Sequence, residues 1–158
     1  GSFIVGMLWV GGVTLTGNAS TLTVSNIPQT GKSLRIAFSG TTTSVLATPR
    51  LKLNGVNATY STVYGQGYNS GQSGLMAFGY IWQNGGGYQI DIPSYSTVQA
   101  SGALRYVNAI SQGASARFGN TSASMSGGTF NLGTGVNSIQ IYNATFKAGT
   151  KLDVWVIS

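Results

Sequence analysis

The stretch SLRIAFSG, residues 33–40, decides the fold class of this chain. Its apolar side chains at positions 34, 36 and 38 alternate with Arg35 and Ala37. Successive side chains of a β-strand point to opposite faces of a sheet, so this alternation predicts a strand with one buried and one exposed face.

The same period of two recurs along the chain, and no segment keeps the apolar stripe of an amphipathic helix. The repeats are Leu51 and Leu53 around Lys52, Ile90 and Ile92 around Asp91, Ile139 and Ile141 around Gln140, and Leu152, Val154 and Val156 around Asp153 and Trp155. Many short strands separated by turn-forming residues are typical of a sandwich or barrel. We therefore predict an all-β, antiparallel β-sandwich.

Glycine, asparagine and serine mark the predicted turns, and no linker divides the chain. The turn groups are Ser39-Gly40, Asn54-Gly55, residues 84–87, Gly127-Gly128 and residues 133–135. Residues 65–74 and 120–128 are predicted to be long loops, and residues 3–13 an ordinary strand. Gly1 and Ser2 look like the remnant of a cleaved tag. A single β-sandwich domain over residues 3–158 is expected.

Charge is scarce: 6% of the residues are charged, against about 25% in an ordinary soluble domain. The net charge is +6, but the eight basic residues are scattered and form no cluster that would follow a phosphate backbone. Nucleic acid is therefore not an expected partner, whereas a weak attraction to anionic cell-surface polymers is. No apolar run approaches the ~20 residues that span a bilayer, so no membrane insertion is expected.

The residue inventory argues against catalysis. The chain has no histidine, cysteine or glutamate, and Asp91 and Asp153 are its only acidic side chains. A Ser-His-Asp or Cys-His arrangement is impossible, and a transition-metal site lacks its nitrogen and sulfur ligands. The two aspartates are expected to be solvated or hydrogen-bonded at outward strand positions. We predict no enzyme activity, no cofactor and no metal.

Binding chemistry is better supplied, because aromatic residues lie beside amides. An aromatic ring stacks on the apolar face of a sugar while amides pair with its hydroxyls, so this mixture suits an amphipathic ligand. The predicted ligand-binding residues are Tyr64, Gln66, Tyr68, Asn69, Tyr80, Trp82 and Asn84. The alternative is that these aromatics pack in the core with their polar ends satisfied.

Trp155 lies on the face of the last predicted strand opposite Leu152, Val154 and Val156. Its ring is therefore expected outside the main core. A large apolar group in such a position implies a subunit contact, a ligand contact or a second core layer. A subunit contact is our first hypothesis.

Several segments resemble the jelly-roll-like β-domains of bacteriophage tail and minor virion proteins. They are residues 20–30 with an Ile-Pro-Gln turn, residues 33–40, residues 51–55 and 58–61, residues 138–142, and residues 146–152 with an Ala-Gly-Thr hairpin. The resemblance implies a jelly-roll sandwich, association with the virion and a symmetric oligomer, often a trimer. It carries no catalytic residues. Val56 stands where an acidic residue often follows the Asn-Gly pair, so any role of that position is in doubt.

Three functions remain open at this point. The first is a phage receptor-binding or tail-fibre domain that recognises a host surface polysaccharide, with other virion proteins and copies of itself, as a homotrimer, as further partners. The second is a structural virion module for capsid decoration or tail assembly, with Trp155 at a subunit contact. The third is a carbohydrate-binding module attached to an enzyme.

Overall fold

The computed structural model describes residues 6–65, 68–73, 75–96, 106–117 and 119–158. Within them every element is a β-strand, and every strand pairing is antiparallel. The strands are β1 (Met7–Thr14), β2 (Leu22–Val24), β3 (Ser33–Gly40), β4 (Leu46–Ala47), β5 (Arg50–Leu53), β6 (Tyr60–Gly65), β7 (Tyr68–Ser73), β8 (Met76–Ala77), β9 (Ile81–Trp82), β10 (Gly86–Pro93), β11 (Tyr106–Arg117), β12 (Asn120–Asn131), β13 (Ile139–Tyr142) and β14 (Lys151–Ile157). No helix long and apolar enough to cross a membrane occurs in this part of the chain.

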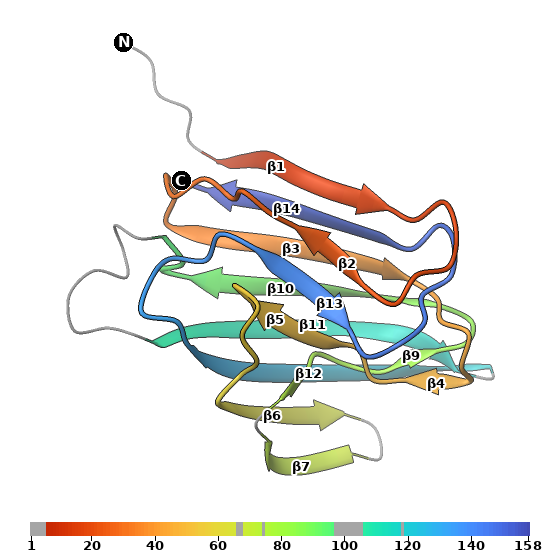
Figure 1. Cartoon of the computed structure of the whole chain (residues 1–158). Coiled ribbons are helices and arrows are strands. Elements are labelled where there is room, and N and C mark those ends of the chain that lie inside the picture. Colours follow the sequence, from red (N-terminus) through yellow and green to blue (C-terminus); the bar gives the residue numbers. More distant parts are fainter. Residues whose placement is uncertain (1–5, 66–67, 74, 97–105, 118) are drawn as a thin grey trace.

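The strands form two packed layers. An eight-stranded sheet has the order β1-β14-β3-β10-β11-β12-β6-β7, and a four-stranded sheet has the order β2-β13-β5-β8. Figure 1 shows β2, β13 and β5 lying in front of the larger sheet, while β6 and β7 extend beyond them at one edge. A small pair, β4 and β9, closes one end. The predicted antiparallel β-sandwich is confirmed, whereas jelly-roll topology stays a prediction.

One hydrophobic cluster fills the space between the sheets. The larger sheet contributes Leu34, Ile36, Phe38, Ile90, Ile92, Leu152, Val154 and Val156, and the smaller sheet contributes Leu22, Val24, Leu51, Leu53, Ile139 and Ile141. The alternation that predicted these strands appears as an alternation of burial. In β3 and β14 every second side chain is buried, and Arg35, Asp153 and Trp155 lie on the other side.

The Asn54-Gly55 turn is also confirmed. Asn54 and Gly55 have positive φ angles of 52° and 74°, as a two-residue hairpin turn requires, and Leu53 and Val56 exchange backbone hydrogen bonds across it. The Asn54 side chain donates to the Gly135 carbonyl at 2.9 Å and accepts from the Asn137 N–H at 2.8 Å. The turn therefore also holds the loop before β13.

Other turn and loop predictions were wrong. Residues 120–128 belong to β12, a strand of 12 residues, and most of residues 65–74 belong to β6 and β7. The Gly127-Gly128 pair lies inside β12, and Gly86 and Gly87 begin β10. Glycine was taken as a turn signal, but at Gly86 and Gly128 it permits the close approach of a neighbouring group. The strand predicted over residues 3–13 is found as β1, and residues 3–5 lie outside the described residues.

Small polar side chains line the inner face of β11 and β12, where an apolar core would be expected. Ser111, Ser115, Ser122, Ser124 and Ser126 are all buried. The segment that carries β9 packs against them: Ser111 Oγ donates to the Phe78 carbonyl at 2.6 Å, and Ser115 Oγ accepts from the Trp82 N–H at 3.3 Å. Hydrogen bonds thus replace apolar packing in this part of the sandwich.

Tyr88 fastens the same segment to the sheet. Its hydroxyl donates to the Tyr80 carbonyl at 2.9 Å, accepts from the Tyr80 N–H at 3.0 Å and lies 2.8 Å from Ser124 Oγ. Burial raises the pKa of the Tyr88 phenol above its ordinary value of 10.0, although the hydrogen bonds lower it. Burial also raises the pKa of Tyr95, whose hydroxyl donates to the Pro28 carbonyl.

These two phenols predict a loss of stability in alkali. Below pH ~10 the folded and the unfolded chain both keep the phenol protons, so the two tyrosines contribute fully to the free energy of unfolding. As the pH rises above ~10 the unfolded chain releases protons that the folded chain retains, and the free energy of unfolding falls until the pH passes the raised pKa. We expect urea midpoints to be constant between about pH 8 and 9.5 and to fall at about pH 11. A Tyr88→Phe variant should be less stable at neutral pH but should lose less in alkali; an equal loss would exclude Tyr88 as a contributor.

Candidate functional site

The side of the larger sheet that faces away from the smaller sheet is the most distinctive surface of the protein, and we call it the outer face. Of the ten large apolar side chains that are exposed among the described residues, six lie on it, and they are Met7, Trp9, Tyr60, Tyr106, Ile110 and Met125. They lie in two groups, Met7 and Trp9 at the β1 edge and the other four over β6, β11 and β12, and exposed apolar groups of this kind often mark a binding surface.

Strand register arranges these side chains in rows that cross the sheet. One row contains Trp9, Trp155, Arg35, Asp91, Ile110, Gly127 and Thr62, each directly opposite the next on the neighbouring strand. A second row contains Gly12, Asp153, Ala37, Gln89, Gln112 and Met125. Side chains directly opposite each other on antiparallel strands are about 4.5–5.5 Å apart at Cβ. Each row is therefore a line of neighbouring positions across the sheet.

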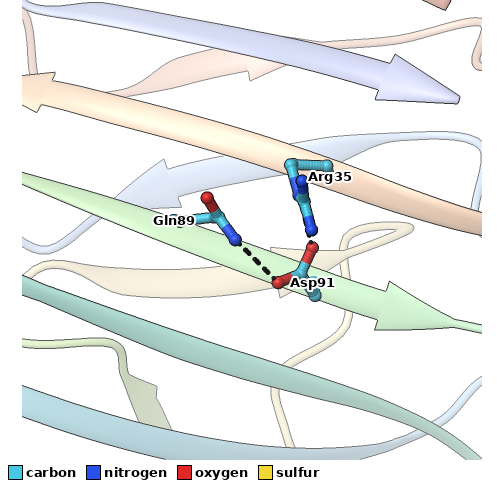
Figure 2. A network of polar contacts seen from close by, with 3 residues as sticks. All are labelled: Arg35, Gln89 and Asp91. Atoms are coloured by element: carbon cyan, nitrogen blue, oxygen red, sulfur yellow. Dashed lines mark hydrogen bonds and ion pairs between the residues drawn. The ribbon is translucent and has the colours of Figure 1, made fainter. Parts of the chain in front are cut away.

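A charged and polar group occupies the middle of the outer face (Figure 2). Arg35 Nε on β3 donates to Asp91 Oδ1 on β10 at 2.9 Å, and Gln89 Nε2 donates to Asp91 Oδ2 at 3.0 Å. The side chains of Arg35 and Asp91 are 38% and 33% exposed. An ion pair so open to solvent contributes little to stability, so its main effect is to fix these groups in place and cancel their charges.

The second aspartate lies near the β1 edge of the same face. Trp9 Nε1 donates to Asp153 Oδ1 at 2.9 Å, and Lys151 Nζ lies 3.4 Å from Asp153 Oδ2. The Trp9 ring is 56% exposed and lies directly opposite Trp155. The hydrogen bond holds one edge of the indole and leaves the rest of the ring facing solvent.

Two open depressions lie on the outer face over β11 and β12. One has a volume of about 420 Å³ and is lined by Tyr60, Thr62, Asn108, Ile110, Gly127 and Thr129, among others. The other has a volume of about 780 Å³ and is lined by Gly87, Gln89, Gln112, Gly113, Ala123 and Met125, among others. Because both are open to solvent, they would cover one side of a ligand rather than enclose it.

The predicted ligand-binding residues do not come together in one cluster. Tyr80 and Trp82 belong to the segment over the inner face of β11 and β12, so they lie away from the outer face. The Trp82 ring is half-buried and carries the Arg117 guanidinium 4.6 Å from its centre. This contact is compatible with the alternative interpretation from the sequence, packing of the ring, and ligand binding by Trp82 stays a prediction. Asn84 is exposed in the turn after β9.

The remaining four predicted residues lie in or beside the β6–β7 hairpin. Tyr64 lies opposite Met125 on β12 and opposite Asn69 on β7, and Tyr68 begins β7. The side chains of these three residues are not described, and Gln66 lies outside the described residues. The hairpin adjoins the part of the outer face that carries the depressions.

Trp155 lies outside the main core, as predicted. It is half-buried on the outward side of β14, between Trp9 on β1 and Arg35 on β3. The subunit contact inferred for it stays a prediction. The sequence did not identify Trp9, which is the more exposed of the two indoles. Trp9 was not singled out because residues 3–13 were predicted to be an ordinary apolar strand.

The two aspartates lie on one face but are poorly placed for joint acid–base chemistry. They are two strands apart and two residues out of register, which corresponds to Cα atoms about 12 Å apart. Each also holds a basic side chain. Among the described residues no group of three His, Cys, Asp or Glu side chains could hold a metal ion.

No protein-family model matches the chain, and a search of the curated proteins finds no match.

Proposed function

We propose that this protein is a non-catalytic domain that binds host surface glycans through the outer face of its larger sheet. The observation that supports this best is the combination of exposed rings with fixed polar groups on one sheet face. Trp9 and Tyr60 are 56% and 54% exposed, and the Arg35–Asp91–Gln89 group lies between them. Rings of this kind stack on the apolar faces of sugars, and amides and carboxylates pair with sugar hydroxyls.

The viral setting belongs to the proposal as well. It rests on the sequence resemblance to phage tail and minor virion domains, which suggests a receptor-binding or tail-fibre domain at the surface of the particle. The absence of catalysis is proposed from the residue inventory and from the two aspartates, each of which is engaged by a basic side chain. A carbohydrate-binding module of a larger enzyme would use the same face.

The test is binding of the labelled protein to intact bacterial cells, with purified surface polysaccharide as competitor. We expect saturable binding that the polysaccharide removes. Trp9→Ala and Tyr60→Ala should each weaken it about tenfold or more, which corresponds to ~1.4 kcal/mol or more for a lost ring contact. Val45→Ala and Val56→Ala serve as controls, because both residues are exposed but lie off the outer face. Equal binding by all four variants would exclude the outer face as the binding surface.

The alternative is a structural virion module in which the β1 edge forms a subunit contact, as in a homotrimer. One observation favours it. The edge strand β1 has no charged residue and no proline, and Met7, Leu8 and Trp9 are 47%, 55% and 56% exposed. Natural proteins usually protect such an edge against pairing with another chain. Analytical ultracentrifugation separates the two functions: dissociation of an oligomer by Trp155→Ala, without any glycan binding by the native protein, would favour the structural module.

A further inference from the structure

Two adjacent glycines in β12 have opposite surroundings, and the contrast identifies a candidate binding position. A Cβ atom on Gly128 would lie 2.5 Å from Met76 Sδ, so this inward position has no room for a side chain. A Cβ atom on Gly127 would meet nothing closer than the Ala109 carbonyl oxygen at 3.9 Å. Gly127 also has no positive φ angle. Neither packing nor backbone conformation therefore requires glycine at position 127.

A glycine inside a strand normally weakens the strand, and it often marks a place where a ligand or another backbone comes close. At Gly127 the missing side chain leaves the floor of the 420 Å³ depression bare. Tyr60 and Ile110, 54% and 50% exposed, form its apolar walls. The larger depression adjoins it along the same two strands, since Met125 and Gln112 lie two residues from Gly127 and Ile110.

Polar groups at the rim are held in a fixed orientation. The Thr129 hydroxyl donates to Asn108 Oδ1 at 2.8 Å, which uses the acceptor atom of that amide. Among the residues that the structure describes, the two N–H donors of the Asn108 amide are then available to a ligand. Thr62 adds a hydroxyl on the neighbouring strand.

None of the described residues that line the depression is charged. The nearest charged residue in the row is Asp91, opposite Ile110, and Arg35 already pairs with it. An anionic ligand would lose its hydration here without gaining an ion pair, whereas a neutral polyol would gain hydrogen bonds and apolar contact. This differs from the anionic glycan that the net charge of +6 suggested.

We infer that the Gly127 depression holds one residue of a neutral glycan, stacked on Tyr60 and hydrogen-bonded by Asn108. This inference rests on the proposed function and specifies its ligand class. Position 127 then determines specificity, because any side chain there would occupy the space of the sugar ring.

The test uses a glycan array that carries neutral oligosaccharides beside others containing uronic or sialic acid. We compare the native protein with Gly127→Val, which places a branched side chain on the floor of the depression. The control is Ala116→Val, which adds bulk at an exposed, outward position of β11 that lines neither depression. Circular dichroism melting checks the fold, and Gly127→Val should melt at the native temperature or above it.

We expect the native protein and Ala116→Val to bind neutral glycans equally, and Gly127→Val to lose at least tenfold in affinity. Native affinity in a folded Gly127→Val variant would overturn this inference and leave the proposed function intact. Preferential binding of anionic glycans that weakens steeply with salt would do the same. If the native protein binds neither the array nor cells, the proposed function fails and this inference fails with it.

Discussion

Replacing Phe38 with alanine is expected to lower the free energy of unfolding by about 3–5 kcal/mol, as removal of a buried phenylalanine usually does. Phe38 is 2% exposed, and its ring makes edge-to-face contacts with Phe78 at 5.4 Å and Phe146 at 5.8 Å between centroids. These partners come from two separate segments that close one end of the sandwich, after β8 and before β14. The Phe38 ring therefore joins three parts of the chain.

This loss is a large part of the net stability of a small domain, which is only about 5–15 kcal/mol. Urea unfolding monitored by circular dichroism measures it. Ser39→Ala is the matched control, because Ser39 is the next residue of β3 and is exposed. A change below ~1 kcal/mol in Phe38→Ala would mean that the cavity collapses and that the three rings do not form a rigid cluster.

The apolar strands could be predicted from the sequence because each faces a core on one side and solvent on the other. Residues 33–40 and the last strand show this period, and the Asn54-Gly55 pair correctly predicted a turn. These are local signals: side-chain alternation and the positive φ angles of one dipeptide. They establish the sandwich but not the order of its strands.

The strand β12 could not be predicted because both of its faces lack the usual pattern. Its inward positions carry Ser122, Ser124 and Ser126, which are all buried beneath the segment packed over them. Ser124 and Ser126 form hydrogen bonds there with Tyr88 and Ser111. A run of serine and glycine looks like a loop when only the sequence is considered. The partner segment, residues 76–82, becomes their neighbour only through the fold.

The binding chemistry expected from the sequence, aromatic rings beside amides, stays a prediction, but the structure shows where such groups lie. Aromatic and amide side chains were expected to act together, and the outer face does bring Tyr60 near Asn108 and Gln89 near Gln112. Trp82 was chosen because it has amide neighbours in the sequence, yet it packs under Arg117. Residues that are close in the sequence can lie on different surfaces of a sandwich. The pairing of strands decides which side chains from distant parts of the chain meet on one face.

Alanine at two glycine positions on the paired strands β11 and β12 is expected to change stability in opposite directions. In Gly113→Ala the new Cβ would lie 2.2 Å from the Gly87 carbonyl oxygen and 2.5 Å from the Tyr88 ring. The paired strands β10 and β11 would have to separate, and overpacking of this kind costs about 1–3 kcal/mol. We expect the upper end of that range, because backbone cannot move aside as a flexible side chain can.

In Gly127→Ala the nearest atom is 3.9 Å from the new Cβ, so no clash arises. Alanine also loses less conformational freedom than glycine on entering a strand, so the free energy of unfolding should rise by about 0.5–1 kcal/mol. The two variants make the same chemical change on paired strands, and urea unfolding compares them directly. If Gly127→Ala lowered the free energy of unfolding as much as Gly113→Ala, Gly127 would have a structural role. Ligand binding would then not be needed to explain a glycine at this position. A gain would mean that glycine at this position lowers stability, which is the outcome expected of a residue kept for binding.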